Sequence, residues 1–234
     1  AAPGLVLFRA DIGQEEPRIA AFLADDEELL YELEHGDVYC PVASIEFGRE
    51  ITREDKEERQ IGKRGFMAWL NGAGHAGIQE SAFWLTRREA NAVIKYLQNK
   101  YPKIEAYRAN LVAHLHEHGY TATHFGRRVH RPEVWSGPGP ALAHAERSVM
   151  PDAIQGTGAD VMKLWLPKIA SGLLDLQDAH LLLTIHDEVV GEIGKNDVDK
   201  IVGICYNTLT GILPINLPCE VYVGHNWSDM EKLS

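Results

Sequence analysis

A polar triplet inside an apolar run constrains this chain more than any other feature. In the stretch LLLTIHDEVVGEI, His186, Asp187 and Glu188 interrupt a run rich in Leu, Ile and Val. Apolar, β-branched residues on both sides predict buried or half-buried strands. Two adjacent carboxylates beside an apolar wall need cations, hydrogen bonds or water, because burying an unpaired charge costs several kcal/mol. The triplet is therefore either the solvated tip of a tight turn or part of a cation-binding site.

Length, charge and hydropathy limit the other possibilities. The 234 residues suffice for one large domain or two small ones, and 45% hydrophobic with 24% charged residues is ordinary for a globular protein. The net charge of -11 argues against nucleic-acid binding through bulk electrostatics, although basic residues cluster at 127–131. No apolar run reaches the roughly 18 residues of a membrane span, and the first residues lack a signal-peptide pattern. We therefore expect a cytoplasmic protein without a membrane partner.

The cysteines do not form a recognisable motif. Cys40, Cys205 and Cys219 are odd in number, widely spaced and free of any CxxC pair. This pattern predicts reduced core residues and neither a disulfide frame nor a zinc site.

The order of predicted elements indicates an α+β fold with a helical insertion between the parts of one sheet. Residues 5–11 read as a strand ending on Asp11, and the polar triplet is flanked by two strands. The other expected elements are helices at 15–33, 37–48, 53–70, 86–99, 103–118, 155–174 and 197–211, a hairpin at 119–132 and a final strand at 219–227.

Two motifs favour ordinary structure over function. GAGHAG at 72–77 matches the dinucleotide pattern GxGxxG, but it follows a predicted helix where that fingerprint requires a strand. His114 and His118 share one helix face while His116 points elsewhere, so a solvated helix end is favoured over a zinc site.

Two further features suggest phosphate chemistry. Asp11 at a strand end and Asp187 at a turn are placed to converge at one sheet rim, the layout of a two-metal phosphoryl-transfer site. Arg59 and Lys63 lie four residues apart and so share a helix face. That pair suits either a solvated basic stripe or a two-pronged phosphate clamp.

Three segments, in order, resemble the palm and fingers of family A DNA polymerases, the bacterial polymerase I and podophage replicase type. ADIGQEEPRIAAFLADDEEL resembles the first acidic motif, RQIGKRGFMAWLNGAG the fingers helix that holds the incoming nucleotide, and LLLTIHDEVVGEI the last motif. GYTATHFGRRVHRPE, AERSVMPDAIQGTGADVMKLW and GHNW support the match, which spans nearly the whole chain. The resemblance implies an antiparallel-sheet palm at 1–22 and 140–234, a helical fingers insertion at 23–139, and right-hand architecture lacking the thumb.

The resemblance also implies the site residues. Asp11 and Asp187, with the carbonyl of Ile12, would bind two Mg²⁺ ions, or Mn²⁺, with Glu188 in a secondary role. Lys63 would be the general acid toward pyrophosphate. The implied dNTP-binding residues are Gln14, Glu16, Arg59, Lys63, Met67 and Asn71, with Glu16 disfavouring a 2′-hydroxyl. The implied DNA-binding residues are Arg127, Arg128, Arg147, Gln155 and His186.

The sequence departs from the family pattern in the fingers helix. Met67 stands where the family usually has an aromatic residue, and Asn71 stands in place of a Tyr. Asn71 cannot stack on a base as Tyr does, so we expect altered nucleotide selectivity. Without a thumb, and with a net charge of -11, unaided binding to primer-template DNA should be weak and salt-sensitive.

Two hypotheses follow. The first is a template-directed DNA polymerase that transfers nucleotides from dNTPs to a primer 3′-hydroxyl, as a fragment or a catalytic subunit whose thumb comes from another polypeptide. The second is a palm-fingers accessory protein that binds DNA or a replication partner with little synthesis. Chance matching by a bland acidic domain is the least favoured, because several motifs agree in order.

Overall fold

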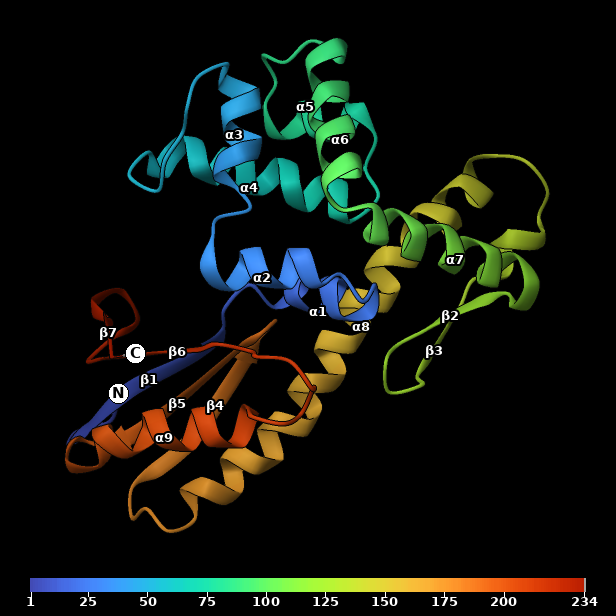
Figure 1. Cartoon of the computed structure of the whole chain (residues 1–234). Coiled ribbons are helices and arrows are strands. Elements are labelled where there is room, and N and C mark those ends of the chain that lie inside the picture. The colour runs from blue at the N-terminus through green and yellow to red at the C-terminus, as the bar shows by residue number, and fades with distance from the viewer. Residues whose placement is uncertain (234) are drawn as a thin grey trace. The chain divides into compact units, whose positions relative to one another are not determined.

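The computed structural model describes residues 1–233 and divides the chain into two compact units (Figure 1). The sheet unit comprises Ala1–Glu15 together with the chain from Gly158 onward, and the helical unit comprises Glu16–Thr157. The sheet is antiparallel and the remainder is largely helical, so the expected α+β class is confirmed. The palm and fingers boundaries stay a prediction.

The sheet unit is built around β1 (Leu5–Ile12). The strand order is β4 (Ala179–Ile185), β5 (Glu188–Gly194), β1, β6 (Cys219–Gly224) and β7 (Glu231–Lys232). In β1, Val6, Phe8, Ala10 and Ile12 are buried, while the residues between them are half-buried. Successive side chains of a strand point to opposite faces. The sheet therefore has one apolar face and one face on which Asp11 lies.

Two helices complete the sheet unit, the C-terminal part of α8 (Pro140–Leu173) and α9 (Val198–Leu209). The Trp165 indole of α8 donates hydrogen bonds to the Cys205 carbonyl of α9 at 3.2 Å and to Thr208 Oγ1 at 3.0 Å. Gly191 of β5 faces Phe8 of β1 so closely that a Cβ would overlap the ring. The apolar core thus fixes the strands that carry the polar face.

The helical unit packs around an aromatic core. Tyr39, Phe66, Trp69 and Tyr101 are all buried, with ring centroids of Tyr39 and Phe66 5.6 Å apart. Its elements are α1 (Glu15–Leu23), α2 (Glu27–His35), α3 (Cys40–Phe47), α4 (Lys56–Leu70), α5 (His75–Ser81), α6 (Arg87–Lys100), α7 (Pro102–His118), β2 (Tyr120–Ala122), β3 (Arg128–His130) and the first part of α8. A short 3₁₀ turn at Pro132–Trp135 belongs to this unit, and two more, at Lys195–Asp197 and Trp227–Asp229, belong to the sheet unit.

The structure corrects several expected elements. Helix α4 starts at Lys56 because Asp55 Oδ2 accepts hydrogen bonds from Thr52 and closes a turn there. Residues 75–81 form α5, and neither this helix nor β7 was among the expected elements. Helix α8 runs without a break through Pro151, because the buried residues around that proline hold it in place and outweigh the lost hydrogen bond.

None of the helices within residues 1–233 combines the length and apolar character needed to cross a bilayer. All three cysteines are free thiols; Cys40 and Cys205 are buried and Cys219 is partly exposed.

Candidate active site

Three carboxylates lie side by side on the polar face of the sheet. Asp11 of β1 is directly opposite Glu188 of β5 and Glu220 of β6. Directly opposed residues of antiparallel strands project from the same face with Cβ atoms about 5 Å apart. We call Glu188, Asp11 and Glu220 the carboxylate row.

The turn between β4 and β5 lies against the end of β1. The turn consists of His186 and Asp187, and the Ile12 N–H donates a hydrogen bond to the Asp187 carbonyl oxygen at 3.2 Å. His186 is exposed with a φ of 53°, and Gln14, just after β1, has a φ of 56°. Non-glycine residues adopt this left-handed region rarely. The structure thus brings Asp11, Ile12 and the triplet together, with a constrained backbone on both sides.

Neighbouring cations compensate the three charges of the carboxylate row unequally. Arg9 Nε lies 3.4 Å from Glu188 Oε2, and Lys232 Nζ lies 3.0 Å from Glu220 Oε1. Burial, followed by the negative charges of Asp187, Glu188 and Glu220, raises the pKa of Asp11 to about 6. The central carboxylate is therefore the one whose charge is least compensated.

The donors in this region fit a hard divalent cation. Within residues 1–233, no three His, Cys, Asp or Glu side chains are already grouped around a metal-binding point. Carboxylate and carbonyl oxygens are nevertheless the ligands that Mg²⁺ and Mn²⁺ prefer. Glu188 Oε1 is buried without a hydrogen-bond partner in the described chain. A cation near Asp11 would compensate both that oxygen and the crowded negative charges.

In the helical unit, α4 carries the expected pair of cations. Arg59 Nε donates to Asp37 Oδ2 at 2.7 Å, whereas Lys63 is exposed to solvent. Burial opposes the ionisation of Asp37, but the Cys40 N–H, the Arg59 guanidinium and the Tyr39 N–H outweigh it and lower the pKa of Asp37. Arg59 is thus already paired, and Lys63 faces the solvent.

Glu16 joins two other predicted site residues in the helical unit. Its Oε2 accepts a hydrogen bond from Asn71 Nδ2 and its Oε1 accepts one from Gln155 Nε2, both at 3.4 Å. Asn71 Oδ1 is buried and has no hydrogen-bond partner among the described residues. Met67 lies one turn earlier on α4 and is half-buried. These contacts form a small polar cluster at the end of the fingers-like helix.

The predicted DNA-binding arginines occupy exposed positions. On the β2–β3 hairpin, Arg127 Nη2 donates to the Gly156 carbonyl at 2.8 Å, and the Arg128 guanidinium carbon lies 4.6 Å from the Tyr120 ring centroid. Arg147 is exposed on α8. Their side chains are accessible to a phosphate backbone.

The histidine-rich end of α7 shows ring contacts and a hydrogen bond. The His114 and His118 ring centroids are 4.3 Å apart, and His116 Nε2 lies 2.8 Å from Glu146 Oε1. No metal-binding group was found here or elsewhere in the described chain.

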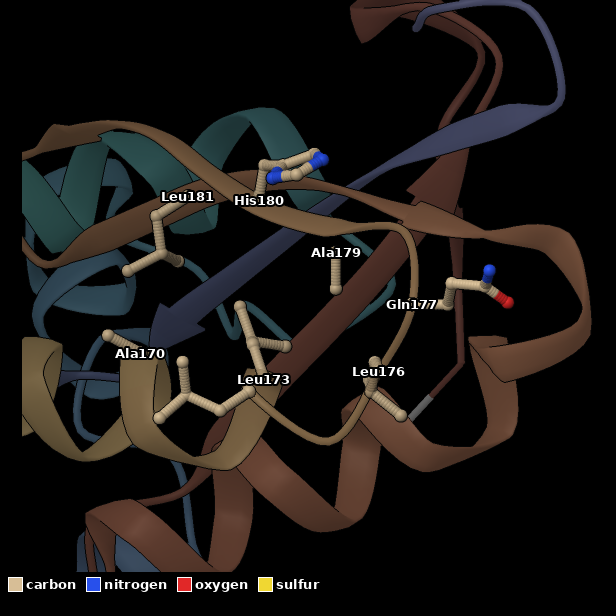
Figure 2. Close-up of a pocket in the computed structure, with 8 residues that line it drawn as sticks. Ala170, Leu173, Leu176, Gln177, Ala179, His180 and Leu181 are labelled. Atoms are coloured by element: carbon tan, nitrogen blue, oxygen red, sulfur yellow. The ribbon is translucent and has the colours of Figure 1, made fainter.

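An apolar groove of about 340 Å³ lies in the sheet unit between the end of α8 and the start of β4 (Figure 2). Leu173, Leu176 and Leu181 line it. It lies at the opposite end of β4 from the His186–Asp187 turn, so it is separate from the carboxylate row.

Sequence reasoning missed two charged residues of these sites, Glu220 and Asp37. Glu220 belongs to the row only through the register of β6 on β1, and Asp37 meets Arg59 across 22 residues of chain. The available signals were that Glu220 lies on the last long strand and that Asp37 lies just before a helix. Neither signal identifies the partner residue.

Comparisons with known proteins agree over nearly the whole chain. The sequence model described as DNA polymerase family A matches residues 1–229. DNA polymerase I of Pseudomonas aeruginosa is 31% identical over 233 residues, which cover 98% of this chain and 25% of that protein. The thermostable DNA polymerase I of Thermus filiformis is 31% identical over 236 residues, covering 99% and 28%.

A solved structure is also similar. The POL domain of Pol1 from M. smegmatis, in complex with DNA primer-template and dNTP, superposes with a TM-score of 0.86 at 25% identity, covering 97% of this chain and 41% of that chain. The chain spans about a quarter of the length of the two curated relatives.

Proposed function

The chain belongs to DNA polymerase family A, and we propose that it catalyses template-directed transfer of nucleotides from dNTPs to a primer 3′-hydroxyl. The observation that carries this proposal is the junction of Asp11 with Asp187 through the hydrogen bond from the Ile12 N–H. It joins two carboxylate-bearing segments at one rim of a rigid sheet. The similar M. smegmatis POL domain forms a complex with DNA primer-template and dNTP, which supports the same substrates for this chain.

In this proposal Asp11, Asp187 and the Ile12 carbonyl hold two divalent cations, Mg²⁺ or Mn²⁺, and Glu188 supports them. The bound ions would lower the pKa of the primer hydroxyl and neutralise the departing pyrophosphate. The raised pKa of Asp11, about 6, and the unpartnered Glu188 Oε1 support this assignment. A bound cation would lower the pKa of Asp11 and give Glu188 Oε1 a partner.

The helical unit would bind the nucleotide. Arg59 and Lys63 are proposed to bind the triphosphate, with Lys63 donating a proton to pyrophosphate. Glu16 is proposed to pack against the sugar and exclude a 2′-hydroxyl, and Gln14, Met67 and Asn71 to contact the nucleotide. Arg127, Arg128, Arg147, Gln155 and His186 are the proposed DNA contacts.

A thumb, supplied by a second polypeptide or by a further part of the same protein, is the proposed partner. The net charge of -11 opposes a firm grip on DNA phosphates by this chain alone. The palm is proposed to comprise residues 1–22 and 140–234, and the fingers residues 23–139.

Primer extension with magnesium at low salt tests this function. We expect template-dependent extension that is lost in Asp187→Ala. Asp175→Ala is the matched control, because Asp175 is an exposed carboxylate of the same unit outside the site; it should keep full activity. Extension that persists in Asp187→Ala would contradict the proposed role of Asp187 as a metal ligand.

The pairing of Arg59 with Asp37 favours the alternative, a palm-fingers accessory protein, because it neutralises a cation that a triphosphate needs. Measurable primer-template binding without extension, with or without candidate partner subunits, would support that alternative.

A further inference from the structure

Two cysteines far apart in the sequence meet inside the sheet unit. Cys205 lies on the buried face of α9 with Ile201 and Leu209, and Cys219 is the first residue of β6. Cys219 is opposite the buried Ile12 in the strand register, so its side chain projects from the apolar face of the sheet. Figure 1 shows α9 beside this sheet, and the two thiols are in hydrogen-bond contact.

Both thiols are carried by well-anchored backbone. The Cys205 carbonyl accepts hydrogen bonds from the Trp165 indole at 3.2 Å and the Thr208 hydroxyl at 3.1 Å. The start of β6 is held by the Gly13 N–H, which donates to the Pro218 carbonyl at 2.8 Å. A bond between the two sulfurs would therefore join α9 to β6 at positions whose backbone is already held.

We propose that Cys205 and Cys219 form a peroxide-sensitive thiol pair that closes to a disulfide. Cys219 is partly exposed and Cys205 is buried, so the peroxide meets Cys219 first. The Cys219 thiolate attacks one peroxide oxygen, the O–O bond breaks, and sulfenic acid and hydroxide form. Cys205 then attacks the Cys219 sulfur, the S–S bond forms and the S–O bond breaks, releasing water that takes the Cys205 proton.

These two steps conserve atoms and electrons. Two thiols lose two electrons and two protons in total, and one hydrogen peroxide becomes two waters. The hydrogen bond to Cys219, together with burial, raises the pKa of the Cys205 thiol. Cys205 is thereby the less readily ionised thiol of the pair, which is consistent with Cys219 reacting first.

The disulfide would lie next to the carboxylate row. Cys219 precedes Glu220, which is opposite Asp11. A bond from Cys219 to α9 would therefore restrict the motion of the end of β6 that carries Glu220. An effect on nucleotide transfer rests on the proposed function, whereas the thiol chemistry does not. Closing the loop between residues 205 and 219 also restricts the unfolded chain.

Intact-mass analysis and thiol alkylation of the full chain after hydrogen peroxide treatment test the pair. We expect the wild type to lose two hydrogen atoms and keep Cys40 as its alkylatable thiol, and Cys40→Ser, the matched control, to close the same disulfide. In Cys205→Ser, the Cys219 sulfenic acid should instead persist and be captured by dimedone. Three free thiols after peroxide, or equal dimedone capture in wild type and Cys205→Ser, would overturn the proposal.

Thermal unfolding supplies a second readout on the wild type. The oxidised protein should melt about 5 °C higher than the reduced protein, and dithiothreitol should reverse the shift. An unchanged melting temperature in protein that contains the disulfide would contradict the proposed geometry. Neither measurement depends on polymerase activity, so failure of primer extension would leave this test intact.

Discussion

The carboxylate row of the sheet unit and helix α4 of the helical unit carry opposite charges and balance them differently. Asp11 has three anionic neighbours, and its pKa is raised to about 6. Arg59 is paired with Asp37, whose pKa is lowered. Negative charge therefore outweighs positive charge around Asp11 in the sheet unit, while in the helical unit the Arg59 cation is already paired with a carboxylate. A divalent cation would meet an excess of carboxylates in the first, although Arg9 and Lys232 already contact two of them, whereas a phosphate must compete with Asp37 for Arg59 in the second.

Replacing Lys63 should have the largest effect on this contrast, since its exposed ammonium is not held by a carboxylate in the described structure. Lys63→Ala should slow single-turnover nucleotide addition about a hundredfold, the scale of a lost general acid. Arg64→Gln removes a neighbouring exposed charge and is the matched control. Equal losses in the two variants would show a bulk charge effect and contradict a specific role for Lys63.

Glu16 tests the part of the proposed nucleotide site that would face the sugar. Glu16→Ala removes the acceptor of the Asn71 and Gln155 hydrogen bonds. The cavity left should admit a 2′-hydroxyl, so discrimination against ribonucleotides should fall about tenfold, as measured by the ratio of kcat/KM values. Gln155→Ala controls for loss of the cluster; unchanged discrimination in Glu16→Ala would remove Glu16 from this role.

Asp37→Asn would free Arg59 while preserving a side-chain oxygen for the Tyr39 and Cys40 N–H groups. Nucleotide KM should fall about fivefold, because a partly exposed ion pair is worth about 1 kcal/mol. Asp55→Asn, which changes an acid paired with Arg49, is the control. A higher KM in Asp37→Asn would instead mean that Asp37 positions Arg59 for the phosphate.

Asp11→Asn should stabilise the metal-free protein slightly. The folded pKa of Asp11 is about 6 against an ordinary 3.8, so its ionisation disfavours the folded state above pH 6 and this penalty disappears as pH falls toward 4. At pH 7.5 the variant should be more stable by less than about 1 kcal/mol, after allowing for solvent screening of a half-exposed group. Unfolding in EDTA at several pH values measures this difference; a gap that does not change with pH would refute the stated cause.

Local patterns explain the part of the fold that could be predicted. Alternating burial in β1, the two strands around the triplet and the left-handed Gly48 that ends α3 all follow from residues close in sequence. The boundary errors at α4 and α8 arose where a side chain-backbone turn or buried packing overrode propensity. The meeting of Asp11 with the turn at Asp187 was predictable because both lie at strand ends, which share sheet rims.

By itself, the sequence determined the family and the α+β class and supplied the residues proposed for the chemistry, because these depend on residue identity and short-range periodicity. Only the tertiary structure decided that Glu220 joins Asp11, that Asp37 pairs with Arg59 and that Cys205 meets Cys219. Those partners are set by strand register and helix packing between segments distant in the chain. A shift of one residue in β6 would turn Glu220 to the apolar face and Cys219 away from α9.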